Sequence, residues 1–182
     1  QGDVIAIIGS SGSGKSTLMN ILNGNETIAR SGGYTGRILL DGRDITIQNH
    51  SQSVACGIAM VHQELALFSG MTVTENIKIN REKTRFSTPL LPELSLLDPK
   101  NNVRDAQHAL EAIGAHMDPD QVIDALSLNQ KQFVELAREL DQQNIRLLIL
   151  DEPTSSHNIT ETKALLSCIR EIADRGIAVI FI

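Results

Sequence analysis

The chain has 182 residues, which predicts about one domain, and its 41% hydrophobic and 21% charged residues match ordinary globular usage rather than disorder or collagen-like repeats. No apolar run approaches the roughly 20 residues of a membrane-spanning helix. The formal net charge of -6 argues against a nucleic-acid partner, because neutralising phosphates needs a positive surface. The two cysteines, Cys56 and Cys168, cannot build a disulfide scaffold, so we expect small buried thiols in a reducing compartment.

The first third of the chain alternates strand-like and helix-like patterns. Residues 4–8 form a continuous apolar run, as does the stretch 177–182 at the other end, and both are typical of strands buried on two faces. A helix is predicted over 15–22, ending near Asn23-Gly24. A two-stranded piece is predicted around Asp41-Gly42, and a short strand over 58–61.

The rest of the chain continues this alternation. Thr72 and Glu75 match a capping box, which predicts a short helix through about residue 79. The stretch 81–102 holds three of the five prolines and shows no periodicity, so we expect a loop-rich insertion or the edge of a subdomain. A strand is predicted over 146–150. Apolar residues at helical spacing predict three further helices, marked by Val103, Ala106, Leu110 and Ile113, by Phe133, Leu136, Ala137 and Leu140, and by Leu165, Ile169 and Ile172. The whole pattern predicts an α/β fold with a mostly parallel central sheet and a small antiparallel β piece.

A phosphate-binding motif joins the first predicted strand to the first predicted helix. It reads Gly9-Ser10-Ser11-Gly12-Ser13-Gly14-Lys15-Ser16 and matches G-x-x-x-x-G-K-[ST] at every fixed position. The glycines let backbone N–H groups form an anion nest at a helix N-terminus. Lys15 supplies a charge for the β- and γ-phosphates, and Ser16 offers a hydroxyl to Mg²⁺. The alternative is a Gly/Ser-rich turn with a surface lysine.

Two carboxylates follow the strand predicted over 146–150. Asp151 and Glu152 emerge at its C-terminal end, which is the sheet edge where ligands bind in open α/β folds. One carboxylate suits Mg²⁺, and the other is then free to polarise an attacking water. The alternative is an acidic surface turn.

At these residues the chain resembles the ATP-binding-cassette (ABC) ATPases. Asp151-Glu152-Pro153-Thr154 is similar to the family's D-E-P-T, and Gln63, within G-I-A-M-V-H-Q-E, resembles the glutamine of its glutamine loop. The stretch through Leu65, followed by M-T-V-T-E-N-I at 71–77, resembles the sugar-importer branch in particular. The resemblance covers nearly the whole chain and is weakest at 81–102.

The resemblance implies the following arrangement. ATP is sandwiched in a head-to-tail dimer with a second ABC ATPase domain. Residues Gly9–Thr17 hold its phosphates. Ser16 and Gln63 meet Mg²⁺, Asp151 holds it through water, and Glu152 is the general base. Gln63 also senses integral membrane permease subunits. The protein would then be a peripheral subunit on the cytoplasmic face of the cell membrane.

The family's signature, usually L-S-G-G-Q, is altered in this sequence. It reads Leu126-Ser127-Leu128-Asn129-Gln130, so both glycines are replaced. Sugar-importer relatives often carry an apolar residue in place of the first glycine, where Leu128 stands. At the second glycine position, the side chain of Asn129 would hinder the approach of backbone N–H to the partner's γ-phosphate, or the residue would be strained if its φ is positive. Ser127 and Gln130 are also a capping-box pattern, so the serine could simply cap a helix. Both interpretations stay open: a working signature, with Ser127, Asn129 and Gln130 facing the partner's ATP, or a weakened site.

Two other departures concern the D-loop and the chain ends. Ser155-Ser156-His157-Asn158 stands where the family usually carries Ala-Leu followed by Asp or Thr. The switch histidine would follow Ile182, and the adenine-stacking aromatic would precede Gln1. We therefore expect a fragment, short at both ends, that hydrolyses ATP poorly by itself. The remaining histidines show no metal-ligand spacing.

The expected organisation is one ABC nucleotide-binding domain over 1–182. A helical and signature subdomain at about 65–142 is inserted in a core of 1–64 plus 143–182. The expected function is ATP binding and hydrolysis for a sugar importer. Two alternatives remain: a degenerate regulatory cassette that binds ATP but hydrolyses it weakly, and a soluble ABC ATPase outside transport.

Overall fold

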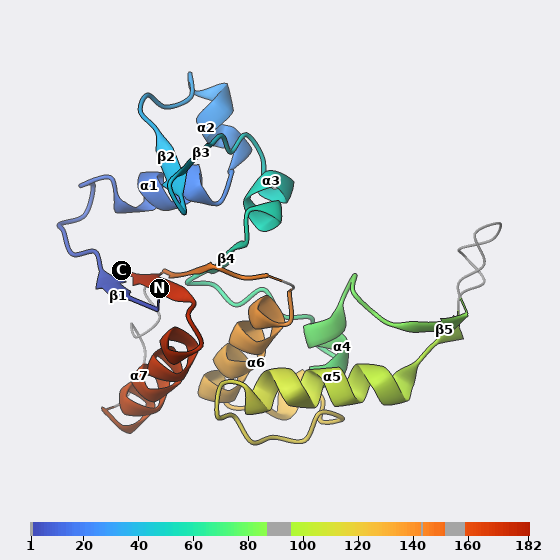
Figure 1. Ribbon diagram of the computed structural model, residues 1–182. Coiled ribbons are helices and arrows are strands. Elements are labelled where there is room, and N and C mark those ends of the chain that lie inside the picture. The colour runs from blue at the N-terminus through green and yellow to red at the C-terminus, as the bar shows by residue number, and fades with distance from the viewer. Residues whose placement is uncertain (1, 87–95, 143, 152–158) are drawn as a thin grey trace. The chain divides into compact units, whose positions relative to one another are not determined.

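The structure is a computed structural model that describes residues 2–86, 96–142, 144–151 and 159–182 (Figure 1). The chain divides into two compact units. The first comprises Gln1–Gln63, Gln143–Ser155 and Ile172–Ile182, and the second comprises Glu64–Gln142 and Ser156–Glu171.

The first unit is built on a four-stranded parallel sheet. Its strands lie in the order β1 (Val4–Ala6), β8 (Ala178–Phe181), β7 (Leu147–Leu150) and β4 (Ile58–Val61), and every neighbouring pair is parallel. The carboxyl ends of parallel strands meet at one sheet edge. The segments that follow β1, β4 and β7 therefore leave from the same edge, as the sequence predicts.

A buried cluster joins this sheet to the first helix. Met19 of α1 (Lys15–Leu22) packs with Ile47, Ile58, Met60 and Ile149. Burying such side chains contributes about 1.5–3 kcal/mol each. The predicted bounds of α1 and of β4 are confirmed, and Gly24 follows the α1 C-cap with φ +68°.

An antiparallel hairpin completes the β structure of this unit. β2 (Ile38–Leu40) and β3 (Arg43–Ile45) pair around Asp41 and Gly42, which have φ +50° and +76°. Two consecutive positive φ angles are what a two-residue type I′ turn requires, which explains the Asp-Gly pair. The predicted two-stranded piece is confirmed.

Two short helices of the first unit were not predicted. They are α2 (Glu26–Arg30) and α3 (His50–Ala55), which are too short to show a helical period. Each begins at an asparagine N-cap: the Asn25 side chain accepts from Thr27 N–H and the Asn49 side chain from Gln52 N–H. The two asparagines were the sequence signal from which these short helices could have been predicted.

The predicted burial of residues 4–8 on both faces is wrong. Among the described strands, β1 stands at the end of the sheet order and pairs with β8. Val4 and Ile5 are 44% and 53% exposed, and Ile8 is 93% exposed. An apolar run thus identifies a strand without showing whether both faces are covered.

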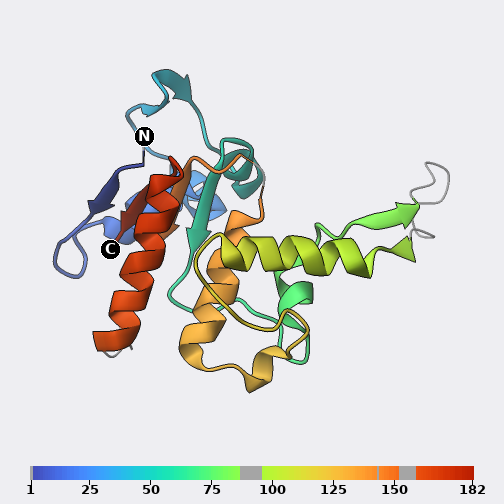
Figure 2. The same ribbon diagram turned by 60° about the horizontal axis from the view of Figure 1, so that its bottom comes forward.

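The second unit is mainly helical (Figure 2). Its helices α4 (Val73–Lys78), α5 (Pro99–Glu111) and α6 (Leu128–Leu140) pack against one another. A 3₁₀ helix, Ile123–Ala125, precedes α6, and α7 (Ile159–Asp174) begins in this unit. The predicted capping box of Thr72 and Glu75 is present, and the predicted periodicity is confirmed by the burial of Ala106, Leu110, Leu136, Ala137, Leu165, Ile169 and Ile172.

The predicted loop-rich stretch over 81–102 is wrong at both of its ends. β5 (Thr84–Phe86) pairs antiparallel with β6 (Leu96–Leu97), and α5 already begins at Pro99. Proline occupies the first helical turn without breaking the helix, and Asp98 caps it by accepting from Asn101 N–H. Desolvation favours the neutral form of Asp98, but hydrogen bonds from Asn101 and the charge of Arg85 outweigh it and lower the pKa of this carboxyl.

Candidate nucleotide-binding site

The loop between β1 and α1 depends on glycine for its conformation. Gly12 and Gly14 have φ +80° and +91°, a region that residues with a side chain rarely adopt. A Cβ at either position would meet no atom within 4 Å, so backbone conformation rather than space requires glycine there.

This loop leaves the start of α1 open. Gly14 is the N-cap and has no side chain to accept a hydrogen bond from the first turn. The first N–H groups of a helix lack intrahelical partners, and the helix dipole gives that end a partial positive charge. Such an end binds anions, phosphates above all.

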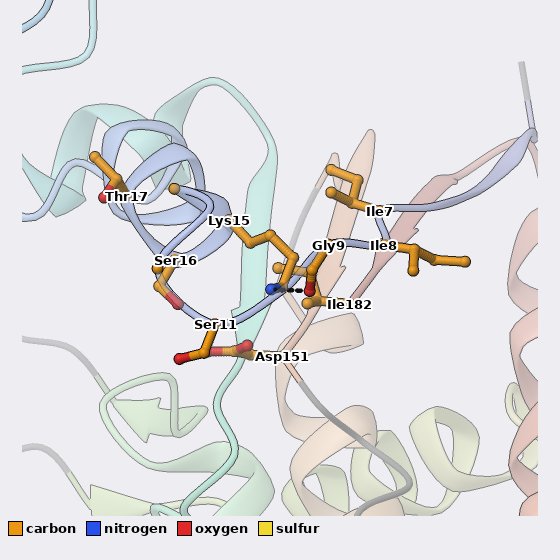
Figure 3. A pocket seen from close by; sticks show the side chains of 11 residues that line it. Ile7, Ile8, Gly9, Ser11, Lys15, Ser16, Thr17, Asp151 and Ile182 are labelled. Carbon is orange, nitrogen blue, oxygen red and sulfur yellow. Dashed lines mark hydrogen bonds between the residues drawn. The ribbon is translucent and has the colours of Figure 1, made fainter.

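A pocket of about 480 Å³ lies against this loop (Figure 3). Every residue of the predicted phosphate-binding set except Ser10 and Ser13 lines it. Among the described residues, the lining consists of Ile7, Ile8, Gly9, Ser11, Gly12, Gly14, Lys15, Ser16, Thr17, Asp151 and Ile182. The motif and the predicted acid at the end of β7 therefore meet in one cavity.

Lys15 folds back over the loop. Its Nζ donates to the Gly9 carbonyl at 2.7 Å and to the Ser10 carbonyl at 3.0 Å, and Figure 3 shows the first of these bonds. These neutral acceptors hold the ammonium at the pocket. A phosphate oxygen would offer it a charged acceptor, and such hydrogen bonds are roughly twice as strong as neutral ones.

Ser16 and Asp151, the two residues of this pocket that were predicted to bind magnesium, both carry oxygen atoms that suit the ion. Magnesium prefers hydroxyl, carboxylate and water oxygens and keeps several waters when it binds. The Asp151 N–H donates to the Val61 carbonyl at 3.1 Å, so the residue is fixed where β7 ends. The donor set therefore fits Mg²⁺ bound together with a nucleotide.

Of the two predicted catalytic residues, the structure describes Gln63. Gln63 lies two residues after the end of β4, at the same sheet edge as Asp151, and is exposed. It does not line the pocket. Glu152, with Pro153, Thr154 and the departures at 155–158, lies outside the described residues.

The signature residues lie at the start of α6. Ser127 is the N-cap: its Oγ accepts from Gln130 N–H at 3.3 Å, and Gln130 Oε1 accepts from Ser127 N–H at 2.9 Å. This is the reciprocal capping box that the sequence predicts. The serine therefore has a structural role, whether or not it also contacts a nucleotide.

Asn129 is a helical residue without the strain considered above. It belongs to α6 and is not among the positive-φ residues of the described chain. With Phe133, one turn further along the helix, it lines a cavity of about 320 Å³ whose lining also includes Ser167, Cys168 and Glu171 of α7. Asn129 is half-buried there, whereas Leu128 is 50% exposed.

Within the described residues, no group of three His, Cys, Asp or Glu side chains could hold a metal ion. No helix in the same ranges is long and apolar enough to cross a bilayer. Cys168 is buried, as predicted, whereas Cys56 is only half-buried.

The sheet order and the pocket define a phosphate-loop nucleotide-binding protein of the α/β class. Comparison with known sequences makes the class specific. The family model described as "ABC transporter" matches residues 1–155, so the chain belongs to the ABC transporter family.

Individual relatives are similar over the full chain. The xylose import ATP-binding protein XylG of Pectobacterium atrosepticum is 40% identical over 181 residues, which are 100% of this chain and 33% of the relative. The ribose import ATP-binding protein RbsA of Clostridium perfringens is 35% identical, with 34% of its length covered. The chain thus spans about a third of the length of these relatives. The predicted resemblance to the sugar-importer branch is confirmed.

Solved structures of the family have the same fold. CbiO1 of Clostridium perfringens, part of the ABC transporter complex cbiONQ, matches with a TM-score of 0.76 at 26% identity, over 100% of this chain and 66% of that one. The ADP conformation of MJ1267, an ATP-binding cassette of an ABC transporter, gives 0.75 at 26% identity, over 100% and 70%. The predicted ABC ATPase fold class is confirmed.

Proposed function

We propose that this chain is the ATP-binding and ATP-hydrolysing part of an ABC importer for sugars. The observation that carries the proposal is the pocket in which the open α1 N-terminus, Lys15, Ser16 and Asp151 meet. Family membership and the two sugar-import relatives support it. The net charge of -6 is no obstacle, because backbone N–H groups and Lys15 bind the one anion required.

In this proposal the site residues position ATP and the attacking water, and they stabilise the charge that develops on the transferred phosphoryl group. The backbone of the loop Gly9, Ser10, Ser11, Gly12, Ser13 and Gly14, with Lys15, Ser16 and Thr17, holds the phosphates. Glu152 accepts a proton from the attacking water as general base. Ser16, Gln63 and Asp151 would hold Mg²⁺, which neutralises charge on the transferred phosphoryl group.

Organisation and partners are part of the same proposal. A helical and signature subdomain at about 65–142 is inserted in the core of 1–64 plus 143–182. A second ABC ATPase domain pairs head to tail with this one, and its ATP faces the N-terminus of α6. Integral membrane permease subunits place the assembly on the cytoplasmic face of the membrane.

Replacing Glu152 by glutamine tests the assignment of the base. We expect single-turnover hydrolysis of radiolabelled ATP to slow by about 100- to 10,000-fold, the usual contribution of a general base. ATP affinity should stay unchanged, because the amide keeps the shape of the acid. Glu26→Gln, an exposed acid on α2, is the control. Hydrolysis by Glu152→Gln at the wild-type rate would show that Glu152 is not the base.

The regulatory cassette is a second candidate, favoured by the two replaced signature glycines. The half-buried position of Asn129 beside α7 supports a working signature instead. We expect Asn129→Gly to change the hydrolysis rate by less than about threefold, as for a substitution outside the reacting groups. Leu128→Gly restores the other replaced glycine, at the exposed neighbour, and is measured beside it. A tenfold or larger gain in either variant would support the regulatory cassette.

A further inference from the structure

The last turn of α1, in the first unit, takes part of its hydrogen bonding from another helix of the same unit. A helix leaves its last four carbonyls without intrahelical partners. In α1 the carbonyls of residues 19–21 accept from the N–H groups of residues 23–25, at its C-cap and directly beyond. The fourth carbonyl, of Leu22, accepts from the Ser53 hydroxyl of α3 at 2.7 Å, and Ser53 is fully buried.

His50, the first residue of α3, adds a second contact at this end of α1. Its Nδ1 lies 3.1 Å from Asn23 Oδ1 and 3.4 Å from the Asn23 carbonyl oxygen. Both partners are acceptors, so we assign the proton of the neutral ring to Nδ1. Gly24 allows the two helices to approach closely, because a Cβ there would collide with the Asn49 carbonyl. The C-terminal end of α1 is therefore fixed against the N-terminus of α3.

The helix α3 is in turn joined to the sheet. Two residues separate it from β4, which pairs with β7, the strand that ends at Asp151. The Gly57 carbonyl, directly before β4, accepts from the N–H groups of Arg146 and Leu147 at 2.8 and 3.1 Å. The contact of α1 with α3 thus links the helix that carries Ser16 to the strand pair that carries Asp151.

Two separated contacts fix the direction of a helix, whereas one contact lets it pivot. The first contact of α1 is Met19, fully buried in the apolar cluster with Met60 and Ile149 of the sheet. The second is the bonded C-terminal end, about 6 Å further along at 1.5 Å per residue. Lys15 lies about as far from Met19 in the opposite direction. A tilt that displaces the C-terminal end would therefore displace the phosphate loop by a similar amount.

We propose that His50 and Ser53 are positioning residues for the magnesium site. By holding the C-terminal end of α1, they keep Ser16 at the distance from Asp151 at which both serve one Mg²⁺. Water could satisfy a helix end equally well, but here a buried hydroxyl 31 positions along the chain ties that end to the sheet. This inference rests on the proposed function, in which Ser16 and Asp151 are magnesium ligands.

The test compares nucleotide affinity with and without magnesium. A fluorescent ATP analogue (mant-ATP) is titrated in Mg²⁺ and in EDTA, and the ratio of the two dissociation constants is the magnesium gain. The gain should fall by about fivefold in Ser53→Ala, the equivalent of one neutral hydrogen bond, and by more than about tenfold when His50→Ala is added. The affinity in EDTA should stay near the wild-type value, because the loop and Lys15 bind the phosphates without Asp151.

Two substitutions of His50 separate its Nδ1 contact from its size. The amide nitrogen of asparagine takes the position of Nδ1, whereas that of glutamine takes the position of Nε2. His50→Asn should therefore keep most of the magnesium gain, and His50→Gln should lose about threefold. Ser51→Ala makes the same change as Ser53→Ala on the exposed side of α3 and should match the wild type. If Ser53→Ala does not fold, the two variants at exposed His50 carry the test.

The outcomes distinguish the two proposals. A wild-type magnesium gain in the double variant and in His50→Gln would overturn the positioning role alone. Equal losses of affinity in EDTA and in Mg²⁺ would also overturn it, because they would mean a general loosening of the phosphate loop. A wild-type chain that binds no nucleotide, or binds it without a magnesium gain, would overturn the proposed function and the positioning role together.

Discussion

Replacing Lys15 by alanine is expected to weaken Mg·ATP binding by about 10- to 100-fold, since a hydrogen bond to a charged group contributes about 1.5–3 kcal/mol. The ammonium already lies at the pocket, 2.7 Å from the Gly9 carbonyl, so the wild-type side chain needs little movement to reach a phosphate. Isothermal titration of the variant with Mg·ATP and with Mg·AMP measures the loss. The loss should be large for ATP and small for AMP, because the lysine is assigned to the β- and γ-phosphates.

Lys100→Ala is the matched control for Lys15→Ala. It removes the same charge from an exposed position on α5 and should bind ATP as the wild type does. If Lys15→Ala bound Mg·ATP with wild-type affinity, the loop would not be the phosphate site.

Replacing Asp141 by alanine is expected to destabilise the chain by about 3–5 kcal/mol, the cost of leaving a buried charge without its partner. Lys78 is 5% exposed, and its Nζ lies 2.9 and 3.1 Å from the two Asp141 carboxylate oxygens. The remaining acid, Asp105, is 3.4 Å away and is shared with Lys83. Urea unfolding followed by circular dichroism measures the free energy of unfolding.

A second substitution separates the energy of the lost ion pair from the cost of burying the charge that it leaves behind. Lys78→Met in the Asp141→Ala background removes the ammonium that has lost its nearer partner and should recover much of the loss, because an apolar residue fits this buried site. Asp44→Ala, which breaks the exposed pair with Arg37, should cost less than about 1 kcal/mol. A loss of that small size in Asp141→Ala would show that the buried pair is not what holds α4 to α6.

The fold was predictable where the sequence pattern is local. The ends of α1, the Asp41-Gly42 turn and the Thr72 capping box each depend on residues within four positions of one another. The exposure of β1 was not predictable, because it depends on strand order rather than on the strand's own residues. Similarly, Pro99 breaks no helix because it occupies the first turn of α5, where its missing N–H would have no intrahelical partner, so the prolines misdirected the prediction over 81–102.

The site was likewise predictable where it is built from continuous sequence motifs. The phosphate loop is one continuous motif, and Asp151 follows a clear strand, so their meeting in one pocket follows from parallel strand order. The hydrogen bond from Ser53 to the Leu22 carbonyl joins residues 31 positions apart and has no local pattern. The cavity that Asn129 lines likewise includes α7 residues about 40 positions further along the chain, so the sequence around the signature could not predict it.

Backbone amide chemical shifts during a Mg·ATP titration test most directly whether this loop binds the phosphates of ATP. The largest shifts should occur at residues 9–17 and at Asp151 in the wild type, and much weaker shifts are expected at the same ATP concentration in Lys15→Ala. Saturable shifts centred elsewhere, or equal shifts in the wild type and in Lys15→Ala, would contradict it.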